Sequence, residues 1–275
     1  SETATEVSTA EELTAAIADV NFDTVKLAAN ISISRSLTVN RPDVTLDLNG
    51  YTLTSGDTEC DIFSVRENGN LTVMDSGTGG KIDGQNKNCG FCIYGGVLTL
   101  ESGTIINCMT DGDGGAVDIS SGDSEGVYGK FVMSGGAITN CKADDDSGAV
   151  DIGAGNGSFV MNGGTIENCS ACNLGGAVNI RENGSFSMTG GTIKNCTVDE
   201  GGSGNAVYGR SDEAIVAISG GTIENCGASP LSFDIFTVSF DSGGGTPVAE
   251  QKVLNARAVR PDGPAKAGYI FKDWY

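Results

Sequence analysis

The sequence contains no histidine, so carboxylates are the side chains best placed to do chemistry. This absence excludes Ser–His and Cys–His nucleophile pairs and most zinc hydrolase designs. Short acidic loops recur along the chain, and two more aspartates alternate with Val and Ile on expected strands. Calcium takes six to eight oxygen ligands, so converging loops of this kind would bind it. The candidate calcium ligands are Asp111, Asp113, Asp144, Asp145, Asp146, Asp118 and Asp151.

The alternative interpretation is that these carboxylates are solvated surface charges, because no acidic run has the spacing of a known calcium loop. No motif in the sequence requires a cofactor. Calcium is the single cofactor that the acidic loops suggest. Arg66 and Arg181 each begin the segment Arg-Glu-Asn-Gly. This is a turn sequence, and we expect both arginines to be solvated corner residues.

A seven-residue phrase recurs along the chain, with steps of 33, 28, 27 and 30 residues between its cysteines. Such a period indicates stacked units, each too small to bury a hydrophobic face alone. Period-two apolar alternation bounded by Gly, Asn and Asp flanks each copy and predicts short strands and turns. The copies are SGTIINC at 102–108, GGAITNC at 135–141, GGTIENC at 163–169, GGTIKNC at 190–196 and GGTIENC at 220–226.

Alignment of the copies gives columns of like apolar residues, such as Ile105, Ile138 and Ile166. If each copy is one coil and neighbouring coils lie ~4.8 Å apart, these columns become continuous interior stacks. The links are too short and too rich in Gly for the helical crossovers of an ordinary parallel sheet. We therefore predict an all-β protein, a parallel β-helix of about seven coils.

The Asn of the phrase predicts a sharp bend, because Asn tolerates left-handed backbone angles. Stacked amides can also hydrogen-bond from coil to coil and form an Asn ladder. The column consists of Asn88, Asn107, Asn140, Asn168, Asn195 and Asn225.

Five of the nine cysteines take equivalent places in successive coils. Their Cβ atoms would lie ~4.8 Å apart on parallel vectors, whereas a disulfide needs ~3.8 Å. We therefore expect a stack of reduced, buried thiols that behave as small hydrophobes, at Cys108, Cys141, Cys169, Cys196 and Cys226. The states of Cys60, Cys89, Cys92 and Cys172 stay open. The pair Cys89 and Cys92 has redox or zinc-knuckle spacing, but neither a second pair nor a histidine accompanies it.

The two ends of the chain differ from the repeats. Ser8 and Thr9 offer a capping box and precede an apolar helical pattern, which predicts one amphipathic helix at roughly residues 10–19. That helix would cover the exposed hydrophobic end of the solenoid. Residues 236–275 contain three of the five prolines and the only Trp. We expect a capped β-helix at 1–235 and a small β module at 236–275.

Both parts resemble known families. The repeats and the cap, over roughly residues 5–235, resemble the right-handed β-helices of the pectin-lyase-like superfamily, of the bacterial surface or adhesin type. The tail is similar to the Listeria–Bacteroides repeat, an internalin-type B repeat, in its Gly243 to Pro247 turn and its Gly-Tyr-x-Phe-x-x-Trp-Tyr ending at 268–275. We expect this module to be truncated and the chain to be a piece of a longer surface protein.

The net charge of −20 argues against binding to nucleic acid or anionic lipid, whose phosphates would be repelled. No run of 18 apolar residues is present, so we expect no membrane span in this chain. The resemblance implies a secreted protein, located outside the cell on the bacterial envelope. Its partner would be an extracellular glycan or a host or envelope protein.

The resemblance leaves several functions open, because the superfamily includes lyases, hydrolases and non-catalytic surface proteins. We favour a non-enzymatic, adhesin-like cell-surface protein, since the sequence offers no recognisable catalytic residues. The alternative is a calcium-dependent polysaccharide lyase or related carbohydrate-active enzyme, which would use an arginine as its base. A second alternative is a structural spacer for further domains.

Overall fold

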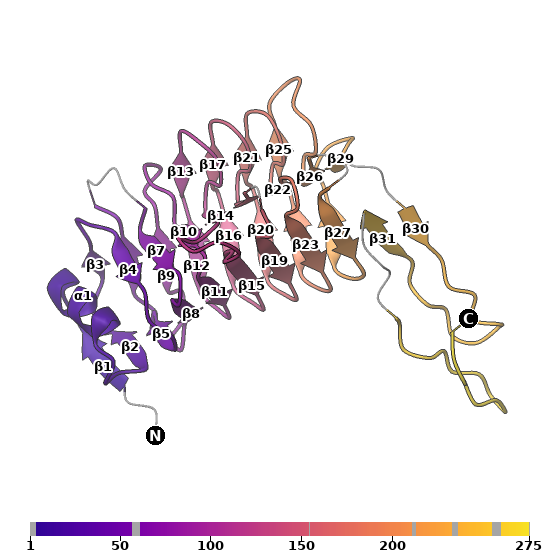
Figure 1. Cartoon of the computed structure of the whole chain (residues 1–275), viewed down its shortest axis with the longest axis horizontal. Helices are drawn as coiled ribbons and strands as arrows, with labels where there is room; N and C mark the ends of the chain where they lie inside the picture. Colours follow the sequence, from indigo (N-terminus) through magenta and orange to yellow (C-terminus); the bar gives the residue numbers. More distant parts are fainter. Residues whose placement is uncertain are drawn as a thin grey trace.

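The computed structural model of the chain describes residues 4–56, 61–153, 155–210, 213–232, 236–254 and 260–274. The protein is an elongated parallel β-helix whose coils stack along the long axis (Figure 1). Three sheets, here called A, B and C, run along the stack, and a shorter sheet D of four strands joins them in the middle and later coils, from Met109 to Val198. The predicted all-β fold class is confirmed.

Each sheet collects one strand from successive coils. Sheet A has eleven strands, in the order β1 (Ala4–Val7), β2 (Thr24–Leu27), β5 (Val44–Asp47), β8 (Asn70–Met74), β11 (Val97–Leu100), β15 (Lys130–Met133), β19 (Ser158–Met161), β23 (Ser185–Met188), β27 (Ile215–Ile218), β31 (Gln251–Leu254) and β30 (Phe236–Val238). Sheet B has eight strands, β3 (Ile31–Ser32), β6 (Thr52–Thr54), β9 (Lys81–Asp83), β12 (Thr104–Ile106), β16 (Ala137–Thr139), β20 (Thr165–Glu167), β24 (Thr192–Lys194) and β28 (Thr222–Glu224). Sheet C has eight strands, β4 (Leu37–Val39), β7 (Phe63–Arg66), β10 (Phe91–Tyr94), β14 (Val117–Ser120), β18 (Val150–Ile152), β22 (Val178–Ile180), β26 (Val207–Gly209) and β29 (Leu231–Ser232). Sheet D has four strands, β13 (Met109–Thr110), β17 (Lys142–Ala143), β21 (Ser170–Ala171) and β25 (Thr197–Val198).

The stack contains eight coils among the described residues, as the strands of sheets B and C show, where the sequence predicted about seven. The first of these coils lies near the amino terminus, at β3 and β4. It lacks the recurring phrase, because this part of the chain keeps only the inward apolar residues that closing a coil requires.

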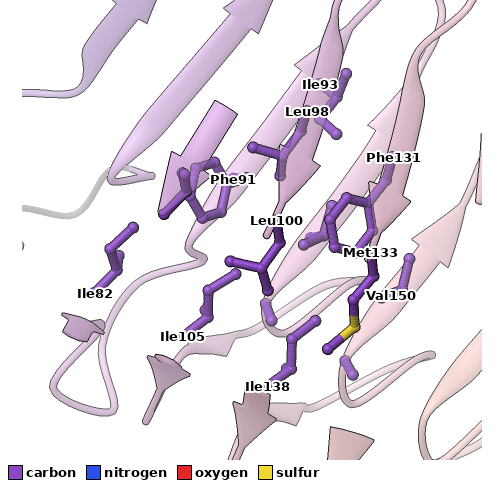
Figure 2. Close-up of a cluster of buried hydrophobic side chains, with 14 of the residues drawn as sticks. Ile82, Phe91, Ile93, Leu98, Leu100, Ile105, Phe131, Met133, Ile138 and Val150 are labelled. Atoms are coloured by element: carbon purple, nitrogen blue, oxygen red, sulfur yellow. The ribbon is translucent and has the colours of Figure 1, made fainter. Parts of the chain in front are cut away.

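Like residues lie directly over one another in the interior. Ile105, Ile138 and Ile166 are register partners in consecutive strands of sheet B. The ring centroids of Phe131 and Phe159 lie 4.8 Å apart with 8° between the ring planes. Figure 2 shows the isoleucines of sheet B and the side chains of sheet A pointing into one shared interior. The predicted apolar columns are therefore confirmed.

Helix α1 (Ala10–Ala18) covers the amino-terminal end of the solenoid, as predicted. The Thr9 hydroxyl accepts a hydrogen bond from the Glu12 amide at 3.2 Å, and the Glu12 carboxylate accepts one from the Thr9 amide at 3.2 Å. Leu13 and Ile17 are buried against the first coil. Val20, which continues the apolar helical spacing of Leu13, Ala16 and Ile17 in the sequence, is 75% exposed, because helix α1 ends at Ala18.

The other end of sheet A is covered by the tail. Strand β27 is the last strand that a coil contributes to sheet A. Strand β31 pairs antiparallel with β27, and β30 pairs antiparallel with β31. Leu254 lies opposite Val216, and both side chains are buried. An open edge of a parallel sheet would leave unpaired amide and carbonyl groups available to another chain, so this pairing protects one edge of the solenoid.

The Asn bend is present at five of the six expected positions. Residues Asn107, Asn140, Asn168, Asn195 and Asn225 have φ between 52° and 55°. Among the described residues, the one amide-to-amide hydrogen bond of this column joins Asn195 Nδ2 to Asn168 Oδ1 at 3.3 Å. The column therefore supplies the bend, and a continuous Asn ladder stays a prediction.

Asn88 does not belong to this column, so its predicted role is wrong. The Met109 amide donates to the Asn88 carbonyl at 3.1 Å, in the same way that the Lys142 amide donates to the Cys108 carbonyl at 2.9 Å. Asn88 thus occupies the cysteine position of its coil. It is buried, and its Nδ2 donates to Ser55 Oγ at 2.8 Å. The reason is that the turn before it, at residues 84–87, is longer than the one-residue bend of later coils.

The five cysteines of the repeats are free and buried, as the repeat spacing predicts. Each thiol lies close to a backbone carbonyl of its own coil, for example Cys141 Sγ at 3.4 Å from the Thr139 oxygen. Burial first, and the neighbouring thiols second, raise the pKa of Cys141 and Cys169 well above the usual range, so both stay protonated. Cys89, Cys92 and Cys172 are also free. Cys60 lies outside the described residues.

We expect Asn168→Ala to destabilise the solenoid by about 1 kcal/mol, because alanine lacks the short polar side chain that lets asparagine adopt the left-handed region. The matched control Asn168→Gly should cost less, about 0.5 kcal/mol, since glycine adopts these angles without strain. Urea denaturation followed by circular dichroism measures both. Equal losses for the two variants would contradict the assignment of this position to a backbone requirement.

Candidate functional site

The candidate site lies on the outward face of sheet C, where polar side chains of five strands form one column. Their Cα atoms are register partners from β7 to β22. The residues on either side of each point inward, because side chains alternate along a strand. The column consists of Ser64, Cys92, Asp118, Asp151 and Asn179.

Two acidic loops approach this column in successive coils. Asp113 lies in the loop that joins sheet D to β14, and Asp146 lies in the equivalent loop before β18. The Asp146 amide donates to Asp113 Oδ1 at 3.2 Å, which holds the two loops together. Asp146 is 4% exposed, so its carboxylate needs a partner inside the protein.

Arg181 is that partner, and the prediction that it is a solvated corner residue is wrong. Its Nη2 contacts the carboxylates of Asp113 and Asp146, the latter at 3.7 Å. Its Nε lies 3.1 Å from Asp151 Oδ2. The backbone does turn at Arg181, but the side chain runs back across sheet C. Buried carboxylates draw it there, because each would otherwise lack a counter-charge.

Arg66 begins the same turn sequence and behaves differently. Its guanidinium lies 4.4 Å from the centroid of the Tyr94 ring, a cation–π contact, and it makes no ion pair among the described residues. The same local sequence therefore gives two environments, since only the coil of Arg181 has aspartates on the two preceding rungs of sheet C.

Burial dominates the electrostatics of the cluster. It raises the pKa of Asp151 to about 7, although Arg181 and the Asn179 amide, 2.7 Å away, act in the opposite direction. Burial, helped by the charges of Asp113 and Asp61, raises the pKa of Asp118 to about 6. For Arg181, burial alone would lower the pKa, but Asp151 and Asp113 outweigh it, so the pKa is raised and the guanidinium stays cationic.

The structure sorts the seven candidate calcium ligands into three groups. Asp113, Asp145 and Asp146 bring carboxylate oxygens within 4.8 Å of one another. Asp118 and Asp151 lie side by side on sheet C, beside Arg181. Asp111 and Asp144 lie apart from these groups in the described chain: Asp111 is exposed, and Asp144 pairs with Lys142 at 2.9 Å.

Calcium binding therefore stays a prediction, and its candidate ligands are now narrowed to Asp113, Asp145 and Asp146. Three carboxylates suit a hard cation, but two of them already contact Arg181, whose positive charge opposes a second cation. Calcium would also need several further oxygens from water or backbone. Nothing in the described geometry assigns it a catalytic step.

A second group of side chains lies at the amino-terminal end of the same column. Donor atoms of Asp61, Cys89 and Cys92 lie within 4.8 Å of one another. The Cys89 thiol lies 3.1 Å from the Gly114 carbonyl. Its hydrogen bond with Cys92, and then burial, raise its pKa well above the usual range. The Cys-x-x-Cys spacing thus brings two thiols together, and Asp61 of the preceding coil adds a carboxylate.

Sequence reasoning missed Arg181 and the structural role of Asn179. One signal was available, since Asp118, Asp151 and Asn179 repeat at one position of consecutive coils and Arg181 follows two residues after the last. Residues two apart on a strand share a face, so the arginine was within reach of the column. The contribution of the distant loop residue Asp113, 68 positions earlier, had no such signal.

Comparison with known proteins agrees with this architecture. Residues 4–214 match the pectate lyase-like adhesive domain. The chain belongs to this family. Residues 236–275 match the Listeria-Bacteroides repeat domain, and this match begins where the sequence composition changes. No curated protein and no solved structure matches the chain significantly.

Both expected resemblances are confirmed, and they indicate a surface adhesive protein. In the described part of the chain, no helix has the length and apolarity needed to cross a bilayer.

We expect Arg181→Gln to reduce the free energy of unfolding by about 3 kcal/mol at pH 8, because it leaves buried carboxylates without a counter-charge. Urea denaturation measures the loss. The control is Arg66→Gln, which begins the same turn but removes only the contact with the Tyr94 ring and should cost below about 1 kcal/mol. A similar loss in both variants would contradict the special role of Arg181.

Asp118→Asn should change how stability depends on pH. The pKa of Asp118 is raised in the folded protein, so its contribution to stability is fully present below about pH 4 and is lost as pH rises through about 6. Relative to the unsubstituted protein, the variant should therefore gain about 2 kcal/mol between pH 4 and pH 7. Denaturation in EDTA across this range measures the difference. The same gain in Asp111→Asn, at an exposed position, would refute burial as the cause.

Proposed function

We propose that this chain is the adhesive part of a bacterial envelope protein, acting outside the cell and without catalysis. The observation that carries the proposal is the family match over residues 4–214, on a β-helix with regular short coils. The Listeria-Bacteroides repeat domain at the carboxyl end supports a surface location, since such domains are typical of surface proteins. Its partner is an extracellular glycan or a host or envelope protein.

The outward face of sheet A is the surface best suited to this role. From β8 to β27, its outward strand residues include no carboxylate, and Lys130 is their one charged side chain. One central column on this face is formed by register partners with hydroxyl and small apolar side chains. It consists of Thr72, Thr99, Val132, Val160, Ser187 and Ala217.

This face contrasts with the rest of a protein of net charge −20. Rows of hydroxyl and methyl groups repeat every ~4.8 Å along it. An uncharged surface of this kind can contact a neutral glycan or a protein without paying for desolvated charge. A polyanionic partner would instead meet the long-range repulsion of the whole chain.

The experiment is a binding assay of the purified chain on an array of neutral and uronate oligosaccharides and extracellular-matrix proteins. Val160→Glu places a charge at the centre of the face and should weaken the binding that is found at least about tenfold. The matched control is Thr165→Glu, at an outward position of sheet B. Equal effects of the two substitutions would move the binding surface away from sheet A.

A calcium-dependent lyase is the second candidate, because Arg181 lies among carboxylates as such an enzyme would require. The ion pairs of Arg181 weigh against it, since a guanidinium with a raised pKa is a poor base. To distinguish the lyase from the non-catalytic adhesive protein, the chain is incubated with polyuronates and calcium, and the absorbance of unsaturated products is measured. Product formation would overturn the non-catalytic proposal, and a clear array hit would count against a purely structural spacer.

A further inference from the structure

One coil of sheet C departs from the sequence that its neighbours share. The three coils that follow read Gly-Ala-Val-Asp at 115–118, Gly-Ala-Val-Asp at 148–151 and Gly-Ala-Val-Asn at 176–179. At the corresponding place this coil reads Cys89-Gly90-Phe91-Cys92, as the pairing of Phe91 with Val117 fixes. Since the other coils close without thiols at these positions, closing the coil does not require either cysteine.

The preceding coil completes the set. Phe63 is the register partner of Phe91, so Asp61 lies beside Cys89 and Ser64 lies beside Cys92. The Ile62 amide donates to the Cys89 carbonyl at 3.1 Å, which confirms this alignment. Two adjacent coils therefore place a carboxylate, a hydroxyl and two thiols at the four corners of one small region.

The donor atoms of this region are close enough to share one ion. A carboxylate oxygen of Asp61 and the Sγ atoms of Cys89 and Cys92 all lie within 4.8 Å of one another. Ligands on a tetrahedral zinc ion with bonds near 2.3 Å are separated by about 3.8 Å, so small side-chain rotations suffice. Both cysteines are buried, at 6% and 7% exposed.

Ser64 provides an independent indication. Ser64 is only 7% exposed, and its Oγ has no hydrogen-bond partner among the described residues. Buried hydroxyls without a partner are uncommon, because each costs free energy. As the register partner of Cys92, Ser64 points outward on the same face, where its hydroxyl can bond a water that completes a metal's coordination.

We infer that Asp61, Cys89 and Cys92 form a site for a thiophilic divalent cation of the zinc class. Two thiolates and one carboxylate supply three protein ligands, and a water held by Ser64 supplies the fourth. The donor set excludes calcium, which takes oxygen ligands, and selects a metal that accepts sulfur. The site is separate from the acidic loops considered for calcium and does not depend on the adhesive function.

Binding would tie two coils of the solenoid together. Asp61 belongs to the coil of β7 and the cysteines to the coil of β10, so the metal crosslinks neighbouring rungs. The thiols release their protons when the metal binds, because the thiolate is the ligand. The site would therefore stabilise the amino-terminal half of the β-helix, and its affinity would fall at low pH.

The experiment titrates the full chain with Zn²⁺ against a chromophoric chelator, with a phosphine reductant present to keep the thiols reduced. We expect one zinc ion per chain, a raised melting temperature and proton release on binding. Cys92→Ser should weaken zinc binding about 100-fold or more. Loss of a residue that only hydrogen-bonds a metal ligand weakens binding less, by about 10- to 100-fold. Asp61→Asn, at a partly exposed position, tests the same site with little risk to folding.

Cys172→Ser is the matched control, because this partly exposed thiol lies on a different face and should leave zinc binding unchanged. Excess Ca²⁺ should not displace the zinc. The inference is overturned if the chain binds no zinc, or if Cys92→Ser and Asp61→Asn bind it as tightly as the unsubstituted chain. Zinc-free protein that carries a Cys89–Cys92 disulfide resistant to the reductant, detected by mass spectrometry, would also overturn it.

Discussion

The whole structure depends on one constraint, that successive coils stack in register. Because apolar residues meet across every rung, and mostly like residues, the one or two inward apolar side chains of each strand build a continuous core. No single coil could bury these side chains alone. The same constraint explains the Asn bends, the buried thiols and the helix and hairpin strand that close the ends, since each keeps the rungs aligned or covers a terminal rung.

Stacking also acts on the outside of the coils, where its effect is less favourable. Equivalent outward positions lie ~4.8 Å apart, so a carboxylate repeated in two coils meets its own copy. Asp118 and Asp151 are such a pair, and the loops that cover them add Asp113 and Asp146. Arg181 offsets this charge at the cost of giving up its hydration. An arginine that is held in several ion pairs and stays cationic stabilises the coil and is poorly suited to proton transfer, which is consistent with the proposed role in binding.

Variation between coils is where function can enter such a fold. The interior tolerates little change, because any residue there must match its neighbours above and below. The outward positions are free to differ, as the serine, cysteine, aspartate and asparagine of one column of sheet C illustrate. From β8 to β27, sheet A uses the same freedom in the opposite way and keeps an almost uncharged outward face on a strongly acidic protein.

The amino-acid sequence by itself determined the β-helix, its repeating interior columns, the capping helix and the different repeat family of the tail. These features follow from local sequence patterns, because the length of each coil and its apolar pattern recur along the sequence. Only the tertiary structure decided that Asn88 takes a cysteine's place, that Arg181 folds back over three aspartates, and that Asp61 meets Cys89 and Cys92. Each of these contacts depends on side-chain conformations and loop lengths in different coils. Because each contact occurs only once, it produces no repeating pattern in the sequence.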